Sequence, residues 1–277
     1  MSIEIIKSTG EKESFDKVKL CESIKHAGAP QDLADTVCSL VEKEVIPKMT
    51  TTKIFRTALN YLIREDIETA AHYSLRRGVA DLGPAGFIFE QYIEAILQAY
   101  GYKTKRDIIM KGQCVSHEID VLAKKGNDCY LVEAKYHNAR GIKTSVNVVM
   151  YSHARLIDIS EELEKKEKKL YKHYAWIITN TKFTTSAIKY GKCRNITLTG
   201  WNYPKNKSLE DLIRGERVYP ITVLPSVNHY AREQFAKAQM ILIQDLLPYS
   251  ARDLEIKFGL PQKLAQQIAK QVRELLV

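Results

Sequence analysis

Hydrophobic positions in the first 80 residues recur mainly with helical spacing. A short apolar strand is expected over residues 3–7, followed by a turn and a polar return. Apolar residues then recur every three or four positions in four runs, which predicts four amphipathic helices near residues 18–25, 33–45, 54–62 and 67–77. Pro47 ends the second run, and three threonines at 50–52 offer caps for the third. This region is predicted to be a small, mostly helical module.

The middle of the chain mixes helical and strand periods. A helix is expected over residues 87–100, and alternating runs around residues 119–137 predict a hairpin. A near-continuous apolar run at 174–179 is typical of a strand buried on both faces. With a long helix at 146–168, a helix at 184–190 and a strand at 195–199, the predicted order is α-β-β-β-α-β-α-β. This order favours an α/β fold with a sheet flanked by helices.

A third region begins after Pro220 and Pro225, and its pattern is helical from about residue 230. Met240 is expected to open its first helix, and Gly259 to make a tight turn before the last one. The predicted domains are therefore residues 1–80, 81–225 and 226–277. The last segment somewhat resembles helix–hairpin–helix DNA-binding units, and a helical cap or dimerisation tail is the alternative.

Composition narrows the range of partners and locations. The net charge of +9 suits a polyanion such as nucleic acid. The chain has no 18-residue apolar run and no signal-peptide core, so we expect no membrane span and a cytoplasmic location. The five cysteines are scattered and form no CxxC pair, which argues against a zinc site or disulfide framework and favours small buried residues.

The predicted hairpin carries three charges where a core is expected. If Gly126 and Asn127 form its turn, Asp120 faces Glu133 with Cβ atoms about 4.5–5.5 Å apart. Two such carboxylates repel each other unless a cation such as Mg²⁺ lies between them. Lys135 shares the face of Glu133, because side chains alternate along a strand. The alternative is a half-exposed sheet stabilised by Glu–Lys pairing.

The segments "SHEIDVL" and "LVEAKYHN" resemble the Asp…Glu-x-Lys core of the PD-(D/E)xK nuclease superfamily, and residues 87–203 are similar to the Mrr-like restriction endonuclease domain. The resemblance also covers "GFIFEQYIEAILQAYGY" and "WIITNTKFTTSAIKYGKCRNITLTGWN". It implies a restriction-endonuclease-like mixed sheet, a DNA substrate and Mg²⁺ or Mn²⁺. Many Mrr-like members have Gln where this chain has Glu133.

The same resemblance implies roles for individual residues. Asp120 and Glu133 would bind the metal together with the carbonyl of Ala134, and Lys135 would be the catalytic lysine. Glu90, on the helix that opens the domain, would bind or orient the metal or the attacking water. His137 lies two residues beyond Lys135, where it would line the cleft or serve the structure alone.

The first 78 residues resemble the ATP-cone domain, on "IEIIKSTGEKESFDKVKLCESIKHA" and the closing "AAHYSLRRG". The resemblance implies a regulatory ATP or dATP site with Lys7, Gly10, Phe15 and Lys17 among its residues. Ser8 and Thr9 replace an Arg-Asp pair, which removes a bidentate phosphate contact. A degenerate cone kept for oligomerisation is the alternative.

Together these patterns predict a nucleotide-regulated, metal-dependent DNA endonuclease of restriction or defence type that forms a homo-oligomer. Two alternatives stay open. One is a nucleotide-responsive DNA-binding regulator that does not cleave. The other is a nuclease with the same core that acts on RNA or branched DNA.

Overall fold

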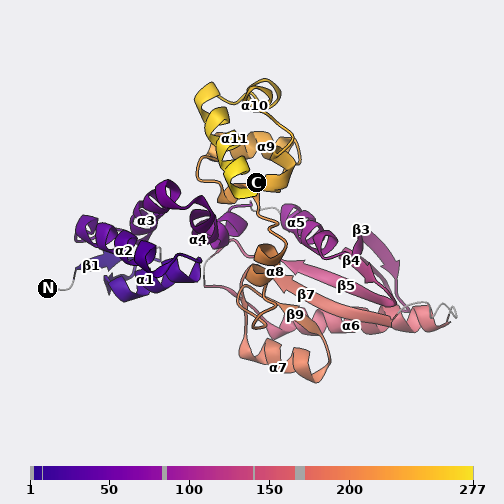
Figure 1. Ribbon diagram of the computed structural model, residues 1–277. Helices are drawn as coiled ribbons and strands as arrows, with labels where there is room; N and C mark the ends of the chain where they lie inside the picture. Colours follow the sequence, from indigo (N-terminus) through magenta and orange to yellow (C-terminus); the bar gives the residue numbers. More distant parts are fainter. Residues whose placement is uncertain (1–2, 8, 83–85, 140, 166–171, 277) are drawn as a thin grey trace. The chain divides into compact units, whose positions relative to one another are not determined.

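The computed structural model of the chain describes residues 3–7, 9–82, 86–139, 141–165 and 172–276 (Figure 1). The chain divides into two compact units. The first combines Met1–Gly78 with Ile221–Ala238 and Leu246–Val277, and the second combines Val79–Pro220 with Gln239–Asp245. None of the helices in the described ranges is long and apolar enough to cross a membrane.

The N-terminal part of the first unit confirms the predicted strand and four helices. Its elements are the antiparallel strands β1 (Glu4–Ile6) and β2 (Lys12–Ser14), then α1 (Lys17–His26), α2 (Gln31–Glu44), α3 (Thr51–Glu65) and all but the last two residues of α4 (Ile67–Ala80). Asp16 and Thr50 cap α1 and α3 by accepting hydrogen bonds from backbone N–H groups in the first helical turn. Ile24, Val37 and Leu62, from three different helices, are buried in one core.

The C-terminal part of the first unit is also helical, with a different start from the one predicted. Its helices are α9 (His229–Lys237), α10 (Ala251–Phe258) and α11 (Gln262–Leu276). The prediction that Met240 opens a helix was wrong, because residues Ile243–Leu246 form a short 3₁₀ turn, η2. Gly259 ends α10 with φ = 64°, which confirms the predicted turn before α11.

The second unit contains a five-stranded mixed sheet of order β3-β4-β5-β7-β9 (Figure 1). Strands β3, β4 and β5 are antiparallel neighbours, whereas β5, β7 and β9 run parallel. The strands are β3 (Lys103–Lys111), β4 (Ser116–Lys125), β5 (Asp128–Lys135), β7 (Lys172–Thr179) and β9 (Thr197–Thr199). The sheet confirms the predicted α/β class and order.

The helices of this unit are α5 (Gly86–Ala99), α6 (Val146–Lys165), α7 (Thr185–Cys193) and α8 (Leu209–Gly215). Leu131 of β5 packs with Ile159 of α6 in one buried cluster. Because side chains alternate along β5, Glu133 points to the same face as Leu131. A short parallel pair, β6 (Lys143–Thr144) with β8 (Lys182–Phe183), was not predicted, since two-residue strands leave no periodic signal.

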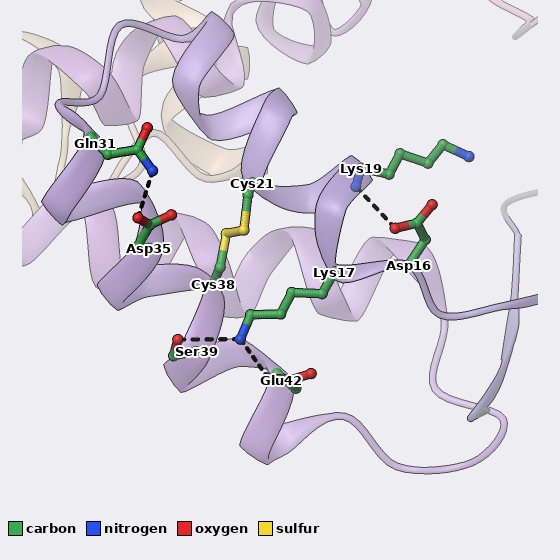
Figure 2. The surroundings of a disulfide bond; sticks show 9 residues. All are labelled: Asp16, Lys17, Lys19, Cys21, Gln31, Asp35, Cys38, Ser39 and Glu42. Carbon is green, nitrogen blue, oxygen red and sulfur yellow. Dashed lines mark hydrogen bonds and ion pairs between the residues drawn. A yellow bond between two sulfur atoms is a disulfide. The ribbon is translucent and has the colours of Figure 1, made fainter. Parts of the chain in front are cut away.

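The cysteines depart from the prediction. Cys21 of α1 and Cys38 of α2 form a disulfide, so the expectation of no disulfide was wrong (Figure 2). Their Cα atoms lie 5.7 Å apart because the two helices pack side by side. Cys38 and Cys129 are buried as expected, whereas Cys114 and Cys193 are exposed.

Candidate active site

The predicted hairpin register is confirmed. The β4–β5 ladder runs from Lys125 opposite Asp128 to Val121 opposite Val132. Asp120 and Glu133 occupy the next positions, directly beyond the last backbone pair. There the Ala134 amide donates a hydrogen bond of 2.7 Å to Asp120 Oδ2. The Asp120 carboxylate thus accepts a hydrogen bond from a backbone N–H of β5 at the point where the ladder ends.

Asp120 lies in an environment that disfavours its charge. Burial and the neighbouring Glu133 carboxylate raise its pKa from 3.8 to about 6, although the Ala134 amide and the Arg155 guanidinium act in the opposite direction. The register of the ladder puts Glu133 in the position opposite Asp120, which agrees with the effect of the Glu133 carboxylate on the pKa of Asp120. Their repulsion is the feature that a bound cation would relieve.

Glu133 pairs with an arginine that the sequence reasoning did not identify. Arg155 of α6 places Nη1 2.9 Å from Glu133 Oε2, and the two side chains are 10% and 17% exposed. The contact is an ion pair without hydrogen-bond geometry, so Glu133 Oε2 and Arg155 Nε are buried atoms without a hydrogen-bond partner among the described residues. A buried carboxylate oxygen in this state has unused capacity as a ligand.

Glu90 of α5 joins the same electrostatic cluster. Burial first, and then the carboxyls of Asp120 and Asp107, raise its pKa from 4.5 to about 7. Asp107 also shares a hydrogen bond with Glu90. Asp107 has φ = 50°, a left-handed conformation that is rare for residues other than glycine, and it falls between the β3–β4 pairs of Arg106 and Ile108. Strained residues of this kind concentrate at functional sites.

Lys135 and His137 follow Glu133 along the chain. Lys135 is the last residue of β5, in register with Thr179 of β7. The pKa of His137 is lowered by burial and, as the smaller cause, by the positive charge of Lys135. His137 is also fixed by Asn180, which accepts from its backbone N–H at 2.9 Å and donates to its carbonyl at 2.8 Å.

Oxygen ligands from Asp120 and Glu133 suit a hard cation such as Mg²⁺ or Mn²⁺. In the described part of the chain, no three His, Cys, Asp or Glu side chains form a group that could hold a metal ion. The predicted set needs only two carboxylates and the Ala134 carbonyl. Glu133 Oε2, which has an ion pair but no hydrogen bond among the described residues, and the raised pKa of Asp120 both fit a cation at this point.

Comparison with known proteins covers almost the whole chain. The model of the ATP cone domain matches residues 3–81, a restriction endonuclease model of the Mrr type matches residues 85–202, and the AF1548-like C-terminal model matches residues 219–276. An uncharacterized protein of Archaeoglobus fulgidus is 32% identical over 181 residues, which are 65% of this chain and 98% of the relative.

The chain belongs to the AF1548-like family. A crystal structure of AF1548, a protein of unknown function, superimposes with a TM-score of 0.53 at 30% sequence identity, covering 68% of this chain and 96% of that chain. In this AF1548-like protein, an ATP-cone domain precedes the Mrr-type restriction endonuclease domain and the C-terminal domain.

The ATP cone of this AF1548-like protein keeps its candidate lysines in ion pairs. Lys7 Nζ lies 3.3 Å from Glu11 and 3.6 Å from Glu13, and these carboxylates raise the pKa of Lys7, with Glu11 the larger cause. Lys19, which the sequence reasoning did not single out, also lies 3.6 Å from Glu13. A nucleotide phosphate that binds these lysines would replace the carboxylates.

The other predicted cone residues lie at the turn and at the start of α1. Gly10 adopts φ = 88° in the turn between β1 and β2, with open space where a Cβ would be. Phe15 packs partly buried against the core. Lys17 Nζ lies 2.7 Å from Glu42 and 3.3 Å from Ser39, close to the disulfide (Figure 2).

Proposed function

We propose that this AF1548-like protein is a metal-dependent endonuclease that hydrolyses phosphodiester bonds in DNA. The observation that carries the proposal is the group of carboxylates at the end of the β4–β5 ladder. There Asp120 has a raised pKa, and Glu133 Oε2 is buried with no hydrogen-bond partner among the described residues. Glu90 of α5, whose pKa is also raised, interacts electrostatically with Asp120. The match to the restriction endonuclease domain supports the same reading.

Asp120, Glu133 and the carbonyl of Ala134 would hold Mg²⁺ or Mn²⁺. When bound, such an ion polarises a phosphoryl oxygen and lowers the pKa of a bound water. Lys135 would orient the attacking water or stabilise the charge that develops on the phosphate. Glu90 has a pKa of about 7, so near neutral pH it can accept a proton from that water and release it again.

The substrate is proposed to be DNA, since the net charge of +9 suits a polyanion and the endonuclease domain is of the restriction type. A restriction or defence role is proposed on the same basis. The helical C-terminal region would contribute to DNA binding or to assembly, with the tight turn at Gly259 between α10 and α11 as its candidate phosphate contact.

ATP or dATP is the proposed regulatory ligand of the ATP cone. Lys7 and Lys17 would neutralise its phosphates, and Gly10 and Phe15 would shape the site around the β1–β2 turn. In this proposal the nucleotide shifts the oligomeric state of the chain and thereby controls cleavage. Mass measurement in solution with and without ATP or dATP tests this part, and an unchanged mass with both nucleotides would contradict it.

Cleavage of supercoiled plasmid DNA tests the proposed activity. Wild-type protein should nick or linearise the plasmid with Mg²⁺ or Mn²⁺ and lose this activity in EDTA. Lys135→Ala should lose nearly all activity, whereas Lys143→Ala, an exposed lysine on β6, serves as the matched control. Equal cleavage by wild type and Lys135→Ala would refute the assignment. Parallel assays on single-stranded DNA, branched DNA and RNA identify the preferred substrate.

A further inference from the structure

A cavity of about 480 Å³ lies in the second unit and shares no lining residue with the carboxylate site. Its walls come from the end of α5, the aromatic residues of β5 and β7, strand β9 and the segment that leads into α8. Cavities of about 300–1,000 Å³ with apolar walls and a few polar groups are typical of small-molecule sites. No step of the proposed hydrolysis uses this cavity.

One wall of the cavity is formed by aromatic rings packed edge to face. The ring centroids of Tyr130 and Trp176 lie 5.3 Å apart, and Tyr102 lies 5.8 Å from Trp176 and 5.9 Å from Tyr130. Trp176 Nε1 donates a hydrogen bond of 2.9 Å to Thr199 Oγ1, which fixes the indole in place. Tyr174 stacks behind Tyr130 without lining the cavity. The wall is therefore a preformed surface, and binding need not order it.

Other lining residues of the cavity carry polar groups. Asn206 and Lys207 are exposed and line it, and Thr197 adds a hydroxyl. Asp211 also lines it, and the carboxylate of Asp211 accepts hydrogen bonds from the backbone N–H and the hydroxyl of Ser208 at the start of α8. An aromatic surface in the same cavity as amide, hydroxyl and ammonium groups matches a planar heterocycle that bears hydrogen-bonding edges and an anion. Bases stack on aromatic side chains with little dependence on sequence, and lysine binds phosphate. A purely apolar ligand would leave these polar groups without a partner.

We propose that this cavity binds a single nucleotide, with the base against the rings of Tyr102, Tyr130 and Trp176 and the phosphate at Lys207. The nucleotide comes either from solution as a free mononucleotide or from a DNA strand that places one base in the cavity. In the second case the inference rests on the proposed function, because the strand is then part of the substrate. Binding in both cases requires no metal ion.

Tryptophan fluorescence of the full chain tests the inference. The protein has two tryptophans, Trp176 in the cavity wall and Trp201, which is 4% exposed, and both belong to the second unit. Titration in EDTA, which prevents metal-dependent cleavage, should show saturable quenching. Quenching by dAMP identifies a free mononucleotide as the ligand, whereas quenching only by a short single-stranded oligonucleotide identifies a DNA strand. If neither ligand quenches the fluorescence, the proposal is overturned.

Matched variants assign the signal to the cavity. Tyr130→Leu should weaken binding roughly tenfold, since stacking of one base on an aromatic side chain contributes about that much. Lys207→Ala should weaken it several-fold, whereas Lys205→Ala, in the same loop but outside the lining, should not. If Tyr130→Leu fails to fold, the lysine pair decides the outcome. Equal affinity of wild type and Lys207→Ala would overturn the phosphate assignment.

Cleavage and cavity binding can fail separately. Lys135→Ala should lose cleavage yet keep the fluorescence response, and Lys7→Ala in the ATP cone should also keep it. If Lys135→Ala still cleaves DNA and quenching requires a higher ligand concentration in Lys207→Ala, the nuclease assignment fails and the cavity site stands. If Lys7→Ala removes the quenching, the signal comes from the ATP cone and the cavity proposal is wrong.

Discussion

Replacement of Arg155 by methionine tests how much the positive charge of Arg155 stabilises the neighbouring carboxylates. Arg155→Met keeps most of the aliphatic stem but removes the guanidinium 2.9 Å from Glu133. The pair is nearly buried, at 10% and 17% exposed, and removing one member of a buried pair costs about 3–5 kcal/mol. Allowing for the remaining solvent access, we expect a loss of about 2–4 kcal/mol in the free energy of unfolding at pH 8.

The cost should depend on pH in a defined direction. At pH 8 Asp120 and Glu90, with pKa values of about 6 and about 7, are both ionised and repel Glu133. At pH 5.5 both are largely protonated, so loss of the arginine should cost less than about 2 kcal/mol. Arg155 lowers the pKa of Asp120, so the variant should also raise that pKa further.

Urea unfolding followed by tryptophan fluorescence measures this effect, because Trp176 and Trp201 both belong to the second unit. The matched control is Lys111→Met. Lys111 Nζ lies 3.3 Å from Glu162, and the two side chains are 70% and 10% exposed. Because solvent screens the exposed lysine, its loss should cost less than the loss of Arg155. Added Mg²⁺ should restore part of the stability of Arg155→Met. An equal loss at both pH values would refute the reasoning, since it would indicate lost packing rather than lost charge.

Three further predictions concern the two proposed sites. Without metal, the free energy of unfolding of the wild type should fall as the pH rises from about 4 to 7, because the raised pKa values of Asp120 and Glu90 let the native state hold more protons than the unfolded state. Added Mg²⁺ should flatten this profile. A rise in stability across the same pH range would contradict the prediction. Lys135→Ala should lower the cleavage rate at least roughly 100-fold while changing the free energy of unfolding by less than about 1 kcal/mol, as compared in parallel cleavage and urea assays. Lys17→Ala should weaken the binding of ATP or dATP to the full chain about tenfold in calorimetry, whereas Lys25→Ala on the exposed side of α1 should not. Equal nucleotide affinities of the wild type and Lys17→Ala would remove Lys17 from the nucleotide site.

The hairpin could be predicted from the sequence because its determinants are local. The Gly126-Asn127 turn and the alternation of the flanking runs fix the register, and the observed pairs follow it. The helices of the N-terminal part were likewise predictable from hydrophobic spacing and capping residues such as Asp16 and Thr50. These signals are contained within a few residues of each other.

Arg155, Asp107 and the Cys21–Cys38 pair could not be predicted in the same way. Arg155 meets Glu133 only because α6 packs on one face of the sheet, and no local pattern gives that contact. Asp107 has φ = 50° within β3, and the regular alternation of that strand gives no sign of it. The two cysteines are 17 residues apart and meet through the packing of α1 on α2.

The most direct test of the central claim is a crystal structure of the protein soaked with Mn²⁺, with the metal located by its anomalous scattering. The account predicts one Mn²⁺ bound jointly by the Asp120 and Glu133 carboxylates, close to the Ala134 carbonyl. In Asp120→Asn the peak should weaken or disappear. If Mn²⁺ is absent from these two carboxylates in the wild type, or binds them separately at distant points, the proposed metal site is wrong.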